Sequence, residues 1–246
     1  TLIGVICRIV TIRRFPDKAV TMDKLIKWGS ISEEAATELM NWVRAGFNIF
    51  ISGGTGCGKT TFLNVLSGFI PSDERVITIE DSAELQLQKI SNLVRMETRN
   101  ENVEGCNAVS IRDLIKTALR QRPDRIIVGE VRGSEALDMM TAFNTGHNGS
   151  MSTGHANSAS DMLSRLETMI LMGMELPLSA IRQQIASCID IMVHLGRLRD
   201  KSRHVLEIAE IDGCIEGKVR LHVLYQFVET GTDDRGRVLG KLEKKG

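Results

Sequence analysis

The sequence predicts an α/β fold with a mostly parallel sheet and an antiparallel β addition near its carboxyl end. Three observations predict it. The segment Gly53–Thr61 has the sequence GGTGCGKTT and fits the P-loop pattern G-x-x-x-x-G-K-[ST]. Through the middle of the chain, short apolar strands alternate with amphipathic helices. After about residue 190, the pattern changes to long stretches typical of β-strands, with a glycine-containing turn between them.

The composition bounds the class of protein. The chain has 246 residues, of which 42% are hydrophobic and 25% are charged, as in a globular protein with a sizeable core. Its formal net charge is zero, which argues against a duplex-DNA binder that works through a broad basic face. No run approaches the roughly 18 apolar residues of a membrane span. The five cysteines are scattered without C-x-x-C spacing, which favours reduced thiols over a disulfide framework.

The amino-terminal stretch differs from the rest of the chain. Residues 1–15 are rich in β-branched side chains and begin with threonine rather than methionine. We expect them to be the last strands of an N-terminal domain, most of which is missing from this chain. A linker at 16–31 includes a Pro-Asp breaker. We place the main α/β domain at 32–230 and a charged tail at 231–246, whose last residues we expect to fray.

The first elements of the main domain surround the P-loop. A helix is predicted over 32–44, because Ser32 can cap its start and Gly46 can stop it. A short apolar strand at 48–52 precedes the loop. A helix with an apolar face follows the loop from Lys59 to the next glycine. Strand, loop and helix in this order are the structural context that a P-loop requires.

The middle of the chain continues the alternation of strands and helices. Strands are predicted at 75–79, 93–96 and 125–128, and helices at 110–121 and 134–144. Ser110 and Asp113 have capping-box spacing at the start of the first of these helices.

The last third turns from helix to strand. A strand through 150–152 is followed by helices that begin at Ser158 and Pro177. Three further strands are predicted at 190–195, 203–211 and 218–228, with a hairpin turn at Gly213–Gly217. The alternating part predicts a parallel sheet covered on both faces, and the β-rich end predicts an antiparallel addition to it.

The P-loop residues predict a nucleoside triphosphate ligand. Glycines let successive backbone N–H groups curl around a polyphosphate, and the helix that starts at Lys59 points its positive end at the anion. Lys59 supplies a charge to the β- and γ-phosphates, and the Thr60 hydroxyl can ligate Mg²⁺. Cys57 is a small spacer. The predicted nucleotide-binding residues are Gly53, Gly54, Thr55, Gly56, Cys57, Gly58, Lys59, Thr60 and Thr61.

Carboxylates follow two of the predicted strands. Glu130 ends an apolar run, as the acid of a second nucleotide motif does, and could hold the metal or its water. Glu84 follows another strand and could polarise the attacking water. Ligands of open α/β sheets lie beyond the carboxyl ends of the strands, where both acids fall. The plainer interpretation of each is a solvated strand end or a helix-cap charge.

Histidines and arginines are further candidates. His147 and His155 share one glycine-rich segment, and an imidazole can bond a phosphate oxygen. Both could equally be ordinary loop residues, and a zinc site is a weaker interpretation, because no second ligand pair accompanies them. Arginines that could neutralise charge in the transition state are Arg13, Arg95, Arg99, Arg120, Arg122 and Arg132, among which the sequence does not choose.

Four segments, taken in order, resemble the secretion ATPase superfamily, which comprises the motors of type II secretion, type IV secretion and type IV pili. The P-loop corresponds to its Walker A motif, Ile77–Glu84 to its Asp box, Arg122–Arg132 to its Walker B motif and Thr145–Ala156 to its His box. The resemblance covers about residues 10–230.

Two shorter segments, Ala118–Arg120 and Glu135–Met140, look most like the CpaF branch of this superfamily, which serves Flp (tight adherence) pili. The sequence has Gly129-Glu130 where other Walker B motifs have an aspartate, but this is the form of the superfamily itself. Cys57 replaces the commoner serine or alanine.

The resemblance implies a RecA-like domain within a ring hexamer, with each ATP between the two domains of one subunit and a neighbour. Matched by position, Glu84 would be the general base, and Glu130 would act at Mg²⁺ or its water. His155, and less directly His147, would sense the γ-phosphate. Arg13 matches an arginine at the end of the family's N-terminal domain that would contact phosphate.

The resulting hypothesis is a cytoplasmic ATPase that hydrolyses ATP with Mg²⁺ and drives pilus assembly or protein secretion. It would be held at the inner membrane by a platform protein, and we expect no direct contact with nucleic acid. One alternative is a P-loop DNA translocase, which the neutral charge and the Asp and His boxes argue against. Another is a nucleotide-binding assembly module with negligible turnover, which Glu84 and Glu130 argue against.

Overall fold

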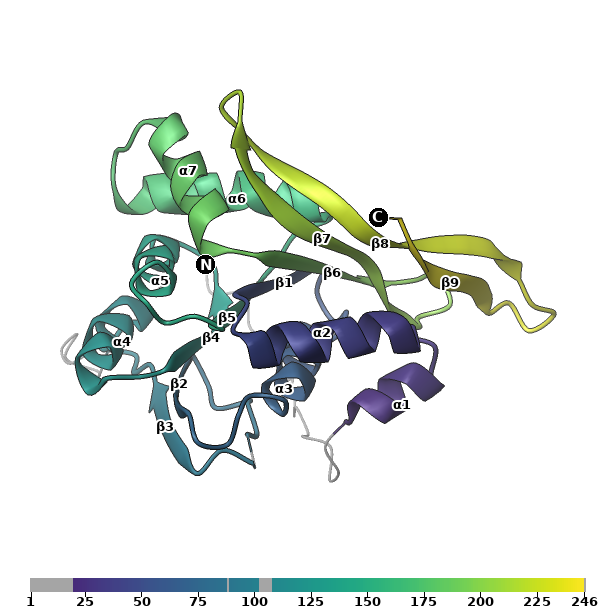
Figure 1. The fold of residues 1–246 in the computed structure, drawn as a ribbon, viewed down its shortest axis with the longest axis horizontal. Helices are drawn as coiled ribbons and strands as arrows, with labels where there is room; N and C mark the ends of the chain where they lie inside the picture. Colours follow the sequence, from purple (N-terminus) through teal and green to yellow (C-terminus); the bar gives the residue numbers. More distant parts are fainter. Residues whose placement is uncertain (1–19, 88, 102–107, 246) are drawn as a thin grey trace, which may run out of the picture.

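A nine-stranded sheet crosses the described part of the chain, residues 20–87, 89–101 and 108–245 of a computed structural model (Figure 1). The strand order is β3-β2-β4-β5-β1-β6-β7-β8-β9, parallel from β3 to β6 and antiparallel from β6 to β9. The strands are β1 (Ile49–Gly53), β2 (Arg75–Glu80), β3 (Asn92–Glu97), β4 (Arg125–Val131), β5 (Met151–Gly154), β6 (Ile191–Arg197), β7 (Arg203–Ile215), β8 (Lys218–Thr232) and β9 (Val238–Lys244). The predicted fold class, a mostly parallel sheet with an antiparallel addition, is confirmed.

Helices cover both faces of the parallel part. One apolar core forms under α1 (Met22–Lys27), α2 (Glu33–Ala45) and α3 (Lys59–Ser67). The other forms under α4 (Ile111–Ala118), α5 (Glu135–Phe143), α6 (Ala159–Gly173) and α7 (Leu178–Cys188). Strand β1 shows why its sequence is apolar throughout: Ile49 and Ile51 enter the first core, and Phe50 enters the second. None of the helices in the described ranges has both the length and the apolar composition needed to cross a bilayer.

Local capping chemistry sets several helix ends where the sequence predicts them. The Ser32 hydroxyl accepts the Ala35 N–H, and Gly46 ends α2 in the left-handed conformation. Ser110 and Asp113 form the predicted capping box of α4. The Ser158 hydroxyl accepts the Asp161 N–H at the start of α6. A 3₁₀ turn, Leu119–Gln121, extends α4 over the rest of its predicted length.

The carboxyl-terminal tail differs from the prediction. Residues 238–244 do not fray but form β9, which pairs antiparallel with β8 from Thr232↔Val238 to Tyr225↔Lys244. Val238 and Leu242 are buried, and the Lys244 ammonium contacts the carboxylates of Glu34 and Glu38 on α2. A charged stretch with two apolar residues four apart can therefore form an edge strand, because Val238 and Leu242 lie on the same face of the strand and are both buried.

Two other boundaries also differ. The region predicted as a linker, 16–31, contains helix α1, whose first turn is capped by the Thr21 hydroxyl. Strand β7 runs on to Ile215, so the tight turn is Glu216-Gly217, where both residues have positive φ, rather than the whole of Gly213–Gly217. Gly213 instead lies within β7, where the pairing with β8 shifts register.

A buried arginine holds together the edge of the sheet where the parallel strands begin. Arg125, 2% exposed, makes a two-pronged ion pair with Glu74 and donates to the carbonyl of Val43 at the end of α2. Gly149 passes close to it, and a Cβ there would lie 2.3 Å from Arg125 Nη1. This one side chain therefore joins β4 to α2 and to the loops before β2 and β5.

We expect Glu74→Ala to lower the free energy of unfolding by roughly 3 kcal/mol, because it leaves the buried Arg125 charge without its carboxylate. The matched control is Glu229→Ala, which breaks a two-pronged pair with Arg199 whose side chains are 55% and 40% exposed. That change should lower stability much less, because water screens an exposed ion pair. Urea unfolding of both variants checks the prediction, and equal losses would contradict it.

Candidate nucleotide site

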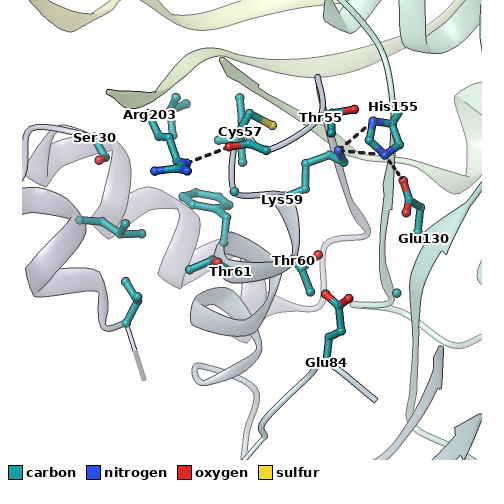
Figure 2. A pocket seen from close by; sticks show the side chains of 18 of the residues that line it. Ser30, Thr55, Cys57, Lys59, Thr60, Thr61, Glu84, Glu130, His155 and Arg203 are labelled. Atoms are coloured by element: carbon teal, nitrogen blue, oxygen red, sulfur yellow. Dashed lines mark hydrogen bonds and ion pairs between the residues drawn. The ribbon is translucent and has the colours of Figure 1, made fainter. Parts of the chain in front are cut away.

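The ends of β1, β2, β4 and β5 meet at one edge of the sheet and open into a cleft of about 920 Å³ (Figure 2). The P-loop begins at the last residue of β1, the Asp-box acids lie at and after the end of β2, Glu130 is the last residue but one of β4, and His155 follows β5. Parallel strands bring these segments together because all their carboxyl ends share this edge. The cleft is lined by Thr55–Phe62, Glu84, Glu130, His155 and Arg203, among others.

The P-loop joins β1 to α3 with the predicted geometry. Gly53 has φ of +155°, and a Cβ at this position would lie 2.4 Å from the Leu195 carbonyl oxygen and 2.6 Å from Cys57 Sγ. Only glycine therefore fits at this position of the turn. Gly58 is the N-cap of α3, so the first N–H groups of that helix face the cleft. Cys57 is a buried free thiol whose pKa is raised by burial.

Lys59 is 7% exposed and lies at the centre of the cleft wall. Its ammonium donates to the carbonyls of Gly53 at 3.0 Å and Gly54 at 3.2 Å, and lies 3.2 Å from His155 Nδ1. Burial lowers the pKa of Lys59, and the nearby Glu130 carboxylate opposes that shift. An ammonium has no acceptor, so His155 Nδ1 accepts from Lys59, and the proton of a neutral imidazole is then on Nε2.

Glu130 joins His155 to Arg132. His155 Nε2 lies 2.7 Å from Glu130 Oε1, and the other carboxylate oxygen accepts from Arg132 Nη2 at 2.6 Å. Arg132 also contacts Asp81 at 3.0 Å. Burial lowers the pKa of His155, and the Lys59 and Arg132 charges add to this against the effect of Glu130. His155 is therefore mainly neutral at pH 7.

Glu84 lies on the other side of the P-loop lysine, below Thr60. Its carboxylate points towards the Thr60 hydroxyl in Figure 2, and it lines the same cleft as Glu130 and His155. Glu80, the last residue of β2, is 5% exposed and has its pKa raised by burial, against the opposing effect of two backbone donors. The two Asp-box glutamates thus have different environments, one half-buried at the cleft and one inside the protein.

Strand β7 and the loop between α1 and α2 also line the cleft, through Arg203 and Ser30 respectively (Figure 2). Arg203 Nε donates to the carbonyl of Gly56 in the P-loop at 2.8 Å. His204 Nδ1 lies 2.9 Å from the Gly29 carbonyl oxygen, and the Val205 N–H donates to that of Ser30 at 2.8 Å. Three consecutive residues of β7 therefore contact both the P-loop and the loop between α1 and α2.

Comparison with known proteins agrees with this geometry. The family model described as "Type II/IV secretion system protein" matches residues 1–238. The chain belongs to this family. Two curated relatives are the putative conjugal transfer protein Rv3659c of Mycobacterium tuberculosis, 38% identical over 84% of this chain, and the type IV secretion system protein PtlH of Bordetella pertussis, 42% identical over 70%. This chain spans 58% and 52% of the length of these two relatives.

Solved structures of secretion ATPases have the same fold. The VirB11 ATPase from the Brucella suis type IV secretion system is 33% identical, with a TM-score of 0.65 over 71% of this chain and 53% of its own. The pilus retraction motor PilT is 20% identical, with a TM-score of 0.54 over 95% of this chain and 55% of its own, and supports the fold alone. The RecA-like interpretation of the fold is therefore confirmed.

Most residues predicted from the secretion ATPase motifs meet at the cleft, but His147 does not. It precedes β5, whereas His155 follows it, so the two lie at opposite edges of the sheet. His147 Nδ1 lies 2.9 Å from the Ala142 carbonyl oxygen at the end of α5. The prediction that His147 acts at the phosphates is therefore not supported by this fold, and its contact is with a helix end. Arg13 lies outside the described residues.

The residues at the cleft fit a magnesium ion held mainly by phosphate. Within the described ranges, no group of three or more histidines, cysteines and acids could hold a metal by itself. Mg²⁺ in nucleotide sites needs only one or two protein oxygens besides phosphate and water. Thr60, Glu84 and Glu130 line the cleft, and Glu130 Oε1 is buried without an aligned hydrogen bond in this part of the chain. That donor set suits Mg²⁺ and its waters.

Three residues of the site escaped sequence reasoning. Glu80 was one of several acids after β2, and Arg203 reaches the P-loop from 147 positions away. His194 of β6 is 6% exposed and lies 2.9 Å from the Ser52 hydroxyl near the end of β1. No local pattern marks the last two residues, because their partners lie 147 and 142 positions away in the sequence.

We expect Gly53→Ala to abolish nucleotide binding and to lower stability, since its Cβ would overlap backbone and Cys57. The matched control is Gly54→Ala, at a position with no atom within 4 Å of the added Cβ. The control should unfold within about 0.5 kcal/mol of the wild type. Binding of a fluorescent ATP analogue and thermal unfolding of both variants check this. A Gly53→Ala protein that binds like the wild type would contradict the P-loop geometry.

We expect His194 to make stability depend on pH. Burial lowers its pKa from the ordinary value of about 6.5, so the folded state binds fewer protons than the unfolded state. Its contribution is thus complete above pH 6.5 and is lost as the pH falls below it. Urea unfolding between pH 7.5 and 5.5 should show a smaller loss in His194→Gln than in the wild type. The control Ser52→Ala keeps the imidazole and should keep the loss. Equal losses in His194→Gln and the wild type would contradict the prediction.

Proposed function

We propose that this protein hydrolyses ATP to ADP and phosphate and uses the reaction to drive a type II/IV secretion machine. The observation that carries the proposal is the meeting of Lys59, Glu84, Glu130 and His155, from four different strand ends, in one cleft beside a P-loop. Each supplies one requirement of phosphoryl transfer: charge neutralisation, water activation, metal placement and contact with the γ-phosphate.

The roles follow from position and protonation. Lys59 and the N–H groups at the start of α3 neutralise phosphate charge. Glu84 accepts a proton from water as the water oxygen bonds to the γ-phosphorus, and the bond from phosphorus to the β–γ bridging oxygen breaks with its electron pair on ADP. A bound Mg²⁺ would neutralise the phosphate oxygens, held at the side of Thr60 and Glu130.

His155 is suited to a contact that changes with nucleotide. Its neutral ring takes a hydrogen bond from Lys59 on one side and faces Glu130 on the other. A γ-phosphate that draws the Lys59 ammonium away would free Nδ1 of His155. The imidazole would then gain or lose a partner according to the phosphate present, which is how a sensor works.

The wider setting is also a proposal. The superfamily resemblance supports a ring hexamer, a peripheral place at the cytoplasmic side of the inner membrane, and a platform protein as partner. Relatives named for type IV secretion and for conjugal transfer support a secretion machine. The Flp pilus assignment rests on the resemblance of Ala118–Arg120 and Glu135–Met140 to the CpaF branch.

Experiments can distinguish two other functions from the proposed one. A DNA translocase would share the P-loop, and some relatives have names that refer to conjugal transfer, so stimulation of hydrolysis by DNA would favour it. A nucleotide-binding assembly module would bind ATP without turnover. The separate placement of Glu84 and Glu130 at the cleft favours hydrolysis over that module.

We expect Glu84→Gln to lower phosphate release at least 100-fold while ATP binding stays within about threefold, because the amide cannot accept the proton of water. The control is Glu97→Gln, an exposed residue at the end of β3 that does not line the cleft. Steady-state phosphate release over a range of protein concentrations, in the full gene product that carries this chain, checks it. Wild-type protein that binds ATP without turnover would favour the assembly module.

A further inference from the structure

The buried carboxylate of Glu80 makes two hydrogen bonds that define the loop after β2. Its Oε2 atom accepts the N–H of Glu84 at 2.9 Å and the N–H of Leu85 at 3.0 Å. Glu80 is 5% exposed, so these bonds are shielded from water and hold more firmly than they would at the surface. This burial is not that of a solvated carboxylate at a strand end.

A second anchor fixes the loop from its far side. The Leu85 side chain is 2% exposed in the first core, and the Gln86 N–H donates to Asn64 Oδ1 on α3 at 2.9 Å. Glu84 is therefore held between Glu80 on one side and the P-loop helix on the other. Its carboxylate consequently points towards Thr60 in Figure 2, and both residues line the same cleft.

The neighbouring strand is shaped to leave room for Glu80. A Cβ on Gly129 of β4 would lie 3.1 Å from Glu80 Cγ and 3.6 Å from the Ile79 carbonyl oxygen. Glycine at this position lets the Glu80 side chain fold over β4 towards the loop amides. These two adjacent residues therefore affect two acids. Gly129 leaves space for the Glu80 side chain, and Glu130 places its own carboxylate in the cleft.

We propose that Glu80 is a positioning residue for hydrolysis, whose carboxylate clamps the Glu84 and Leu85 amides and so holds the Glu84 carboxylate beside Thr60. The proposal rests on the proposed function of Glu84 as the general base. It assigns the two Asp-box glutamates separate tasks: one accepts the proton of water, and the other fixes where the acceptor lies.

The test compares Glu80→Gln with Glu80→Met. Glutamine keeps a carbonyl oxygen that can accept both amide hydrogens, whereas methionine has similar length and no comparable acceptor. Hydrogen exchange of the segment 81–87 should be at least tenfold faster in Glu80→Met than in the wild type and close to the wild type in Glu80→Gln. In the full gene product, kcat of Glu80→Met should fall at least tenfold with KM for ATP within about twofold, and glutamine should restore it.

Two further variants separate positioning from general loss of stability. Glu74→Ala weakens the opposite edge of the sheet and should leave kcat of the folded protein unchanged. If Glu80→Met does not fold, Gly129→Ala displaces Glu80 from the neighbouring strand. It should raise exchange of the same segment and lower kcat without changing KM.

The outcomes are distinct for the two proposals. The positioning role is overturned if segment 81–87 of Glu80→Met exchanges hydrogen at the wild-type rate, or if it exchanges faster while kcat is unchanged. In either case Glu84→Gln still tests whether Glu84 is the general base. Equal loss of kcat in Glu80→Gln and Glu80→Met also overturns it, since the acceptor would then not matter. Full hydrolysis by Glu84→Gln overturns the proposed base, and with it any need to position that residue, whatever the exchange rates show.

Discussion

A buried ammonium group is the constraint on which the cleft depends. Lys59 is almost fully removed from solvent, so its charge must be matched by nearby polar groups. The carbonyls of Gly53 and Gly54 come from the P-loop, His155 from the end of β5, and Glu130, behind His155, from β4. These groups meet only if β1, β4 and β5 keep their register, because a slip of one residue would reverse every side chain between the two faces. The geometry that stabilises the lysine is also the one that a polyphosphate needs.

Three glutamates at this edge show that residue type alone does not fix a role. One carboxylate oxygen of Glu130 contacts Arg132, and the other lies 2.7 Å from His155. Glu80 accepts hydrogen bonds from two backbone amides. Glu84 is half-buried at the cleft. Burial raises the pKa of Glu80, and the hydrogen bonds from two backbone amides oppose that shift. These different environments are the basis for the separate roles that we propose for three chemically identical side chains.

Sequence reasoning succeeds where structure depends on near neighbours. The P-loop, the caps at Ser32, Ser110 and Ser158, and the alternation of strands and helices each follow from residues within a few positions of one another. It fails where the deciding partner is distant in the sequence, as for Arg203 on Gly56 and His194 on Ser52. The separation of His147 from His155 was within its reach, because a strand predicted through 150–152 already puts residues before and after it about 13 Å apart at about 3.3 Å per residue.

The antiparallel addition is part of the nucleotide cleft rather than an appendage to the sheet. Without β7, the side of the P-loop next to β6 would have no strand to close it, and the α1–α2 loop would lose the partners of its Gly29 and Ser30 carbonyls. Phe227 of β8 packs against His204 and holds it at Gly29, with ring centroids 5.0 Å apart. Because Arg203, His204 and Val205 are consecutive on one strand, the tip of the P-loop and the α1–α2 loop share a single rigid support. Moving the α1–α2 loop away from β7 would break the backbone hydrogen bond between Val205 and Ser30, and moving the P-loop away would break the contact of the Arg203 side chain with Gly56, so β7 links the two loops.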